Sequence, residues 1–477
     1  MSMLIAVLLL TVVALVIAIG RTSGFTRPPR WQRDPIRVGQ RDKPRRFLLT
    51  GATGFIGYRL GKHILEAGDE LWVLTRNARR ARDLFGPHAT IVSSPSEISE
   101  LTRIDFIVNL AGERIFAKRW TTRRREQLVQ SRLSVTQALV ALIARLHTKP
   151  RALISMSAVG YYGVRGDEEL SEADHGRPIF QSQLCQMWEL AAQNASSYGV
   201  RVCRIRLGMV LGNEAGAFPR LVLGARMRVR TVLGTGDQWM SWIHIEDVIR
   251  LIGFCADNDD VRGAINGTAP EPVRQIEFAK ALSGLWNPAI CIRVPAQLLR
   301  KLLGEMAELL VDGQKVVPLR ARSAGFEFKY RNLASALAQL TTPRSITPPA
   351  EIFYDAFCPV CSVEMDGYCR AARRAGLAWR FADVSIDRDL MMKYGLDVEL
   401  ARRRVYVLDR SGALISGMEA IGRIWSNLPG WQRLGRLLQW PVVKPVAEHF
   451  YDFVLAPLIW GWNRRRRAQL ASASRLH

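Results

Sequence analysis

Short apolar segments alternate with helix-length stretches along the first part of the chain. Five such segments are strand candidates, at residues 47–50, 71–75, 104–110, 151–156 and 201–207. Strands that alternate with helices favour a parallel sheet with helices on both faces, so we expect an α/β fold. From about residue 213 to 345 the alternation loosens, which indicates a smaller part folded against the edge of the sheet.

A second strand and helix pattern follows a Pro-rich segment. Residues 341–350 are rich in Pro and Thr and poor in apolar side chains, which is typical of a linker. We expect strands at 351–354, 378–384, 404–409 and 413–416, with a helix after the first. The sequence therefore predicts two folded parts joined by a linker.

The first twenty residues carry no charge and are almost wholly aliphatic. Twenty helical residues span about 30 Å, the thickness of a bilayer core. A signal peptide is the competing interpretation, but it requires a cationic start, which Met1-Ser2-Met3 does not provide. We therefore expect a single-pass transmembrane helix at residues 1–20 in the inner or plasma membrane.

The chain is strongly basic, with a net charge of +24. Residues 21–45 form a basic juxtamembrane linker, which by the positive-inside rule places the following domains in the cytoplasm. Its cations are expected to lie on anionic lipid headgroups. A nucleic-acid partner is the rival explanation of the positive charge. The sequence contains no known nucleic-acid-binding module, so we expect no nucleic-acid partner. The seven cysteines, mostly in apolar segments, suit a reducing compartment.

Three glycines, Gly51, Gly54 and Gly57, follow the first apolar strand, and an amphipathic stretch comes directly after them. Strand, glycine turn and helix together bind a pyrophosphate at a helix N-terminus in Rossmann-type domains. Gly51 permits the tight turn, Gly54 lets the backbone approach the phosphates, and Gly57 lets the helix lie close to the sheet. A glycine turn that serves packing alone is the other interpretation.

The end of the second strand indicates which dinucleotide binds. An NAD enzyme has an acidic residue there, about 20 residues past the glycines, for the ribose 2′-hydroxyl. This chain has Arg76, followed by Arg79 and Arg80. A cation suits a 2′-phosphate, so we predict NADP(H) as the cofactor; a solvated strand end is the alternative role of Arg76.

The turn Thr50–Gly57 resembles that of extended short-chain dehydrogenases/reductases, and the segments Asn109–Glu113, Ser155–Gly163 and Gln238–Asp247 resemble their epimerase-like subfamily. The resemblance covers about residues 46–340, including the small C-terminal subdomain of that subfamily. It implies an NADP-binding site made by Gly51, Thr53, Gly54, Phe55, Ile56, Gly57, Arg76, Leu110, Ala111 and Gly112.

The resemblance leaves the reaction open. Hydride transfer in this superfamily uses a Ser or Thr, a Tyr and a Lys, and Ser157 stands at the place of the Ser. Gln181 and Cys185 stand where the Tyr and Lys are expected, and neither reproduces their proton relay. Tyr161 and Tyr162 follow the strand that carries Ser157, so they are either acid–base candidates or structural aromatic residues.

The segment Tyr354-Asp355-x-x-Cys358-x-x-Cys361 resembles the thiol-disulfide oxidoreductase-like family named for its Asp-Cys-Cys motif. This match, from about 350 to 465, implies a thioredoxin-like domain. Cys358 would be the attacking thiol at a helix start, and Cys361 would resolve the mixed disulfide. Two packed thiols are the alternative. A zinc site needs a second Cys/His pair, which is not nearby, so we expect no metal.

The expected order of parts follows from these patterns: 1–20 anchor, 21–45 linker, 46–290 NADP-binding domain, 291–340 small subdomain, 341–350 linker, 351–465 CxxC domain and 466–477 basic tail. The predicted function is a membrane-tethered NADP(H)-dependent oxidoreductase or epimerase-like enzyme that acts on a small-molecule substrate. Its fused dithiol domain would exchange with a thiol redox partner. The alternative is a non-catalytic NADP(H)-sensing or regulatory protein at the membrane.

Overall fold

A computed structural model describes residues 39, 42–341, 349–384, 386, 402–410, 414–438 and 443–473. Contacts within the chain divide it into two units, of which the first extends to Thr341 and the second follows from Thr342. Each unit is described by itself.

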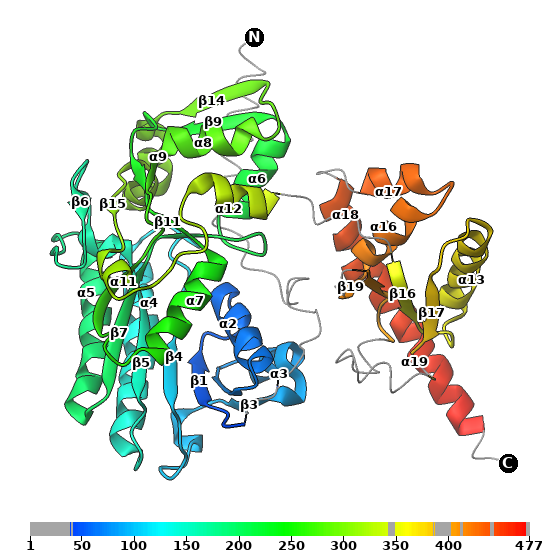
Figure 1. The fold of residues 1–477 in the computed structure, drawn as a ribbon, viewed down its shortest axis with the longest axis horizontal. Helices are drawn as coiled ribbons and strands as arrows, with labels where there is room; N and C mark the ends of the chain where they lie inside the picture. The colour runs from blue at the N-terminus through cyan, green and yellow to red at the C-terminus, as the bar shows by residue number, and fades with distance from the viewer. Residues whose placement is uncertain are drawn as a thin grey trace. The chain divides into compact units, whose positions relative to one another are not determined.

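The first unit is built on a parallel sheet with the strand order β12-β7-β5-β4-β1-β2-β3 (Figure 1). Its strands are β1 (Arg46–Thr50), β2 (Glu70–Leu74), β3 (Ala89–Val92), β4 (Phe106–Asn109), β5 (Ala152–Ala158), β7 (Arg201–Leu207) and β12 (Gly263–Gly267). The order reverses between β1 and β4, and open α/β sheets bind ligands beyond the carboxyl ends of strands at such a reversal. The predicted Rossmann-type sheet is confirmed, and β3 and β12 extend it beyond the predicted strands.

Helices cover both faces of this sheet (Figure 1). Helices α4 (Thr122–Arg145) and α5 (Phe180–Gln193) pack together on one face, and α2 (Phe55–Glu66) and α7 (Ile245–Asp257) pack together on the other. Fully buried Leu48 and Leu153 of the sheet contact Leu139 and Ile143 of α4 in one apolar cluster. Burying each such side chain stabilises the fold by about 1.5–3 kcal/mol. Helix α3 (Ala78–Phe85) connects β2 to β3.

A smaller part of the first unit packs at the carboxyl edge of the sheet, against the starts of α4 and α5. Its elements are α6 (Phe218–Arg226), β9 (Val229–Leu233), α8 (Gln275–Gly284), β14 (Ile290–Val294), α9 (Ala296–Leu303), α10 (Glu308–Val311) and α12 (Leu333–Thr341). Helix α11 (Leu319–Ser323) lies beside the edge strand β12. Short strand pairs join β6 (Glu169–Leu170) to β15 (Lys315–Val316), β8 (Met209–Leu211) to β11 (Trp242–His244), and β10 (Trp239–Met240) to β13 (Val273–Arg274).

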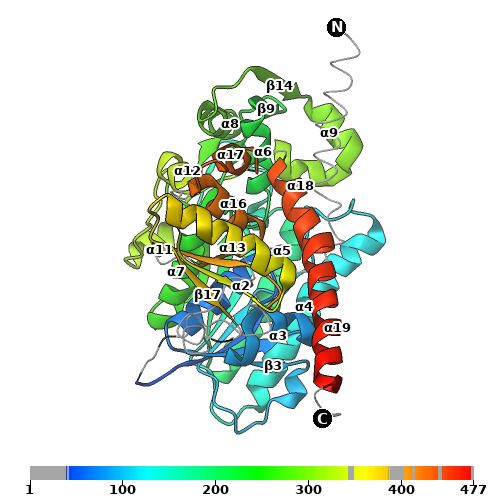
Figure 2. The ribbon, with the colours of Figure 1, turned by 90° about the vertical axis from the view of Figure 1, so that its right-hand side faces the viewer.

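The second unit has a four-stranded sheet in the order β17-β16-β18-β19. Strands β16 (Pro349–Tyr354) and β17 (Arg380–Asp383) are parallel and are joined through α13 (Pro359–Arg374), whereas β18 (Tyr406–Asp409) and β19 (Leu414–Ser416) form an antiparallel hairpin. Helices α16 (Met418–Asn427) and α17 (Gln432–Leu438) follow. Helix α18 (Val443–Phe450), a π-helical turn (Tyr451–Leu455) and α19 (Ala456–Ala473) form a continuous run (Figure 2).

The membrane-anchored fold class requires correction. The predicted transmembrane helix at 1–20 lies outside the described residues, and within the part that the structure describes no helix is long and apolar enough to cross a membrane. The long helix α19, for example, carries consecutive arginines from Arg464 to Arg467. The fold is therefore two α/β units without a described membrane span, and the predicted membrane localisation and lipid-headgroup partner are withdrawn.

Candidate functional site

The glycine turn brings the carboxyl end of β1 against the start of α2. Gly51 has a φ of +67°, and a Cβ atom there would lie 2.7 Å from the carbonyl oxygen of Leu110. A Cβ atom on Gly57 would lie 2.2 Å from the carbonyl oxygen of Gly51, so the helix can start directly on the turn only with glycine there. Gly54 caps α2 without a side-chain hydrogen bond. The positive end of the helix dipole thus lies beside the carboxyl ends of the paired strands β1 and β4.

The other residues predicted to bind the cofactor gather beside this turn. Thr53, Phe55 and Ile56 are partly exposed at the start of α2. Leu110 and Ala111 directly follow β4, and their backbone contacts Gly51, as the distances to a Cβ on that glycine indicate. The structure therefore brings the predicted residues from the two strand ends together.

A chain of buried hydrogen bonds joins the carboxyl ends of β1 and β4 next to the glycine turn. Thr50 at the end of β1 donates its hydroxyl to Asn109 Oδ1 at the end of β4 (2.8 Å). Asn109 Nδ2 donates to Thr136 Oγ1 of α4 (2.9 Å), and Trp188 Nε1 of α5 donates to the same hydroxyl (3.1 Å). The chain links both strands to both helices on one face of the sheet.

Arg132 of α4 is a functional candidate that sequence reasoning did not select. Its guanidinium donates to the carbonyl oxygens of Leu128 (3.0 Å) and Glu113 (3.1 Å), and it would lie 3.2 Å from a Cβ atom on Gly112. Burial lowers the pKa of Arg132. The nearby Glu113 carboxylate pairs with Arg124 (3.3 Å), whereas the half-buried Arg132 guanidinium also donates to Ser131 Oγ (3.5 Å) and lies 5.1 Å from the centre of the Trp188 ring. The pair Ser131-Arg132 is one of the segments in which the sequence resembles the epimerase-like subfamily, and this resemblance is the signal that could have selected Arg132.

Positive charge surrounds the end of β2. Arg76 is exposed just past this strand, and Arg80 lies in the first turn of α3. Burial and then repulsion by Arg114 lower the pKa of Arg80, and the same two causes lower the pKa of Arg220 in α6. Cations from separate elements therefore add to an electropositive surface that favours an anionic ligand.

Ser157 lies near the end of β5, where its buried hydroxyl donates to Glu189 Oε1 of α5 (2.7 Å). Arg206 of β7 donates to both carboxylate oxygens of Glu189, at 2.8 and 2.9 Å. Burial is the largest single influence on the pKa of Arg206 and lowers it, but the hydrogen bonds and charge interactions with Glu189 and Tyr162 together raise this pKa above its usual value. Ser157 thus belongs to a fully buried, bidentate ion-pair network.

Tyr162 extends the same network. Its hydroxyl donates to Asn266 Oδ1 of β12 (2.6 Å) and accepts from Arg206 Nη1 (2.9 Å). Burial raises the pKa of Tyr162 to about 12, so it keeps its proton near neutral pH. Tyr161 is only partly buried, and the Arg206 guanidinium lies 3.4 Å from the centre of its ring.

The places of the missing Tyr and Lys are filled on α5. Gln181 Nε2 donates to Glu308 Oε2 of α10 (3.0 Å), which ties the helix to the smaller part of the unit. The buried Cys185 thiol hydrogen-bonds Ser157, and burial raises the pKa of this thiol to about 11. A neutral thiol therefore stands where the superfamily has an ammonium group.

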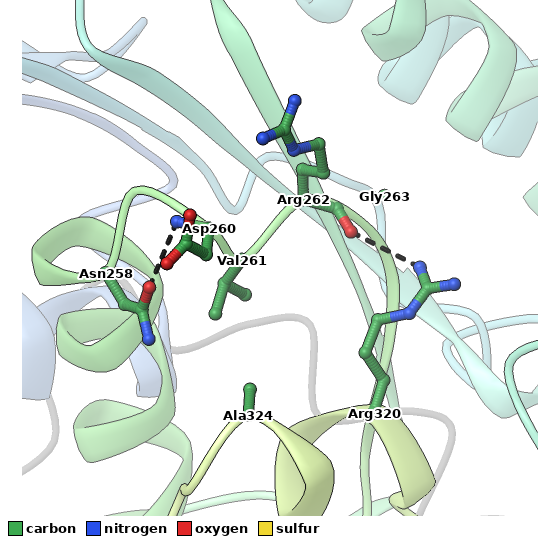
Figure 3. A pocket seen from close by; sticks show the side chains of 7 residues that line it. All are labelled: Asn258, Asp260, Val261, Arg262, Gly263, Arg320 and Ala324. Atoms are coloured by element: carbon green, nitrogen blue, oxygen red, sulfur yellow. Dashed lines mark hydrogen bonds between the residues drawn. The ribbon is translucent and has the colours of Figure 1, made fainter.

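A separate hollow of about 520 Å³ lies at the amino end of β12 (Figure 3). It is lined by Asn258, Asp260, Val261, Arg262, Gly263, Arg320 and Ala324. Its polar groups bond one another: Asp260 N donates to Asn258 Oδ1 (3.0 Å), and Arg320 Nη1 donates to the carbonyl oxygen of Arg262 (3.2 Å). Because β12 runs parallel to β1, this hollow lies at the opposite edge of the sheet from the glycine turn.

The CxxC motif of the second unit starts α13. Cys358 is the N-cap residue, and its sulfur accepts a hydrogen bond from the backbone N–H of Cys361 (3.3 Å). The hydrogen bond from the Cys361 thiol is the largest cause that lowers the pKa of Cys358, to about 6. The same pairing, followed by burial, raises the pKa of Cys361. The pair thus combines one thiolate with one protonated thiol. No group of His, Cys, Asp and Glu side chains in the described part of the chain is suited to a metal ion.

Three family models match consecutive parts of the chain. Residues 47–266 match the NAD dependent epimerase/dehydratase family, and residues 294–340 match a domain of unknown function, DUF1731. Residues 352–459 match the DCC1-like thiol-disulfide oxidoreductase family.

Whole relatives align with the first unit. The epimerase family protein YfhF of Bacillus subtilis is 36% identical over 300 residues, which cover 62% of this chain and 98% of the relative. A chloroplastic epimerase family protein of Arabidopsis thaliana, named as an SDR39U1 homolog, is also 36% identical, over 62% of this chain and 87% of its own. The structure of human epimerase family protein SDR39U1 (isoform 2) with NADPH has a TM-score of 0.56 at 30% identity, covering 62% of this chain and 99% of that one. The chain therefore belongs to the epimerase family, with a nicotinamide-cofactor-binding fold, and carries a DCC1-like thiol-disulfide oxidoreductase domain after it.

Proposed function

We propose that the first unit binds NADP(H) and acts as an oxidoreductase or epimerase-like enzyme on a small-molecule substrate. The observation that carries this proposal is the glycine turn, whose Gly51 and Gly57 leave no room for side chains at the carboxyl end of β1. The human relative solved with NADPH supports the same cofactor class.

The residues at the carboxyl ends of β1, β2 and β4 have the chemistry that such a dinucleotide would need. Gly51, Thr53, Gly54, Phe55, Ile56 and Gly57 would hold the diphosphate at the start of α2, and Leu110, Ala111 and Gly112 would border the nicotinamide half. Arg76 would pair with the 2′-phosphate, supported by the positive charge of Arg80 and Arg114. When bound, the nicotinamide supplies hydride transfer.

We propose fewer acid–base residues than the sequence analysis did. Of Ser157, Tyr161 and Tyr162, the first and third are committed to the buried network around Arg206. Tyr161 is the partly exposed member of the three, so we propose it as the acid–base candidate.

A non-catalytic NADP(H) sensor is the second candidate function. It is favoured by the contact of Gln181 with Glu308 and by the neutral Cys185 in the place of the lysine. A complex with cofactor distinguishes the two: an acid–base side chain beside the nicotinamide ring favours the enzyme, and its absence favours the sensor.

Fluorescence titration with NADPH and NADH tests the cofactor proposal. Wild-type protein is expected to prefer NADPH. Arg76→Ala removes one charge-assisted contact, worth about 1.5–3 kcal/mol, and should weaken NADPH binding by roughly 10- to 100-fold while leaving NADH unaffected. Arg82→Ala, on the exposed side of α3, is the matched control. Equal wild-type affinities for the two cofactors contradict the 2′-phosphate assignment, and binding of neither contradicts the whole proposal.

We propose thiol–disulfide exchange for the second unit. The Cys358 thiolate attacks a partner disulfide, so that a mixed disulfide forms while the partner's S–S bond breaks and its leaving sulfur takes up a proton. Cys361 then loses its proton and attacks the Cys358 sulfur, so that the mixed disulfide breaks and the departing partner sulfur takes up a proton. The partner leaves as a dithiol, and this unit keeps the disulfide, so two electrons have passed to the partner.

A further inference from the structure

We propose that Asn463 of the C-terminal helix α19 is part of the thiol site and stabilises the Cys358 thiolate, with Arg467 as the positioning residue that holds the helix there. This inference rests on the proposed thiol–disulfide exchange and adds to it residues about 100 positions away in the chain.

The contact itself is specific. Asn463 is 4% exposed and Cys358 is 1% exposed, and the Asn463 side chain hydrogen-bonds the Cys358 sulfur. Asn463 Oδ1 has no hydrogen-bond partner within the described structure, so the amide nitrogen is the bonded atom and the sulfur is the acceptor. Burying an amide costs free energy unless it is hydrogen-bonded. The hydrogen bond to the Cys358 sulfur therefore compensates for the burial of the Asn463 amide nitrogen.

This donor favours one protonation state of Cys358. A thiol accepts hydrogen bonds weakly, whereas a thiolate accepts them as a charged group does, about twice as strongly. Among the causes that lower the pKa of Cys358, the Asn463 hydrogen bond follows that of Cys361. The two donors come from α19 and α13 and converge on one sulfur.

Arg467 fixes α19 over the CxxC segment. It lies four residues after Asn463, hence on the same face of the helix, and its guanidinium pairs with the buried carboxylate of Asp355. The guanidinium groups of Arg466 and Arg467 also lie 5.3 and 4.5 Å from the centre of the Phe357 ring. The segment just before Cys358 is thus clasped by the same helix face that presents Asn463.

Several titratable groups face this site. Asp355 and Glu364 lie near Cys361 and raise its pKa, and Cys361 in turn acts on Tyr451 of the π-helical turn. Burial raises the pKa of Asp355, while Arg467 and Arg402 oppose the rise. The carboxylates of Asp355 and Glu364 repel a thiolate. The uncharged Asn463 amide donates a hydrogen bond instead, and so stabilises the thiolate against this repulsion.

The test measures how the alkylation rate of Cys358 depends on pH in the reduced full-length chain, with iodoacetamide as the probe and mass spectrometry of the Cys358 peptide as the readout. Asn463→Ala should raise the pH of half-maximal rate by about one to two units, from the loss of one hydrogen bond to a charged group. Asn463→Asp keeps the size of the side chain but replaces the donor by a carboxylate, so its shift should be larger.

Arg467→Ala should reproduce part of this shift, and Asn463→Ala/Arg467→Ala should shift no more than Asn463→Ala alone, because Arg467 acts through Asn463. Arg465→Ala, exposed on the same helix, is the matched control and should titrate like wild type. If Cys358 titrates like a free thiol in wild-type protein, the proposed exchange function fails. If wild type has the lowered value and both Asn463 variants share it, only the role of Asn463 is overturned.

Discussion

The hydroxyl of Ser157 lies 2.7 Å from a carboxylate oxygen of Glu189, and both side chains are buried. The residue that resembles a catalytic serine is therefore hydrogen-bonded to a carboxylate that already holds Arg206. We therefore expect the Ser157 hydroxyl to stabilise the fold.

Ser157→Ala should destabilise the first unit by about 1–3 kcal/mol, the loss of one hydrogen bond to a charged group, and leave NADPH affinity nearly unchanged. Glu189→Gln should cost more, about 3–5 kcal/mol, because Arg206 then stays buried without its counter-charge. Urea unfolding followed by tryptophan fluorescence measures both. A Ser157→Ala protein of wild-type stability that no longer binds NADPH would show that the hydroxyl serves the cofactor instead.

Gly57→Ala should destabilise the first unit and abolish NADPH binding, because the added Cβ would lie 2.2 Å from the Gly51 carbonyl oxygen. Gly253 of α7 is the matched control, since a Cβ there meets nothing within 4 Å. Gly253→Ala should stabilise the helix by about 0.5–1 kcal/mol. Thermal unfolding with and without NADPH compares the two variants. A Gly57→Ala protein that binds NADPH like wild type would contradict the proposal that the turn has no room for a Cβ atom at residue 57.

Arg132→Ala should weaken NADPH binding by roughly 10-fold or more while leaving the affinity for adenosine 2′,5′-bisphosphate unchanged. The reason is that its guanidinium lies against Gly112, in the stretch proposed to border the nicotinamide half. Arg123→Ala, exposed at the start of α4, is the control. Titrations with both ligands test this prediction. An equal loss of affinity for the two ligands would contradict a position of Arg132 beside the nicotinamide half.

Cys358 should be alkylated with a half-maximal rate near pH 6, and the rate should fall about tenfold per unit below that pH as the thiolate is protonated. Cys361→Ser removes the thiol that most lowers the pKa of Cys358, so the inflection should move upward. A lowered pKa in the folded state adds stability above the pKa of a free thiol, about 8.5, and this share is lost as pH falls towards 6. An inflection near 8.5 in wild type would contradict the thiolate.

The sequence was informative where structure depends on local spacing. Gly51, Gly54 and Gly57 could be predicted because the turn and the helix after it lie within a few residues. Strand β12 escaped prediction because it has the sequence Gly-Ala-Ile-Asn-Gly, with little apolar content, and is a strand through its parallel pairing with β7.

Partners that meet only in the folded chain could not be predicted in the same way. Glu189 and Arg206 are separated by 17 residues and Tyr162 and Asn266 by 104, and nothing in their local sequence indicates that they bond. The same holds for Asn463 and Cys358 in the second unit. Motif matching selected Ser157 and Cys358 as candidates, whereas their hydrogen-bond partners Glu189 and Asn463 come from distant parts of the sequence.

The bond between Thr50 and Asn109 has a consequence for recognition itself. It joins adjacent strand ends at the topological reversal, and Asn109 is in turn bonded to Thr136 of α4. A dinucleotide that binds at these strand ends as proposed would meet side chains already held by hydrogen bonds, so little of its binding free energy would be consumed in ordering them.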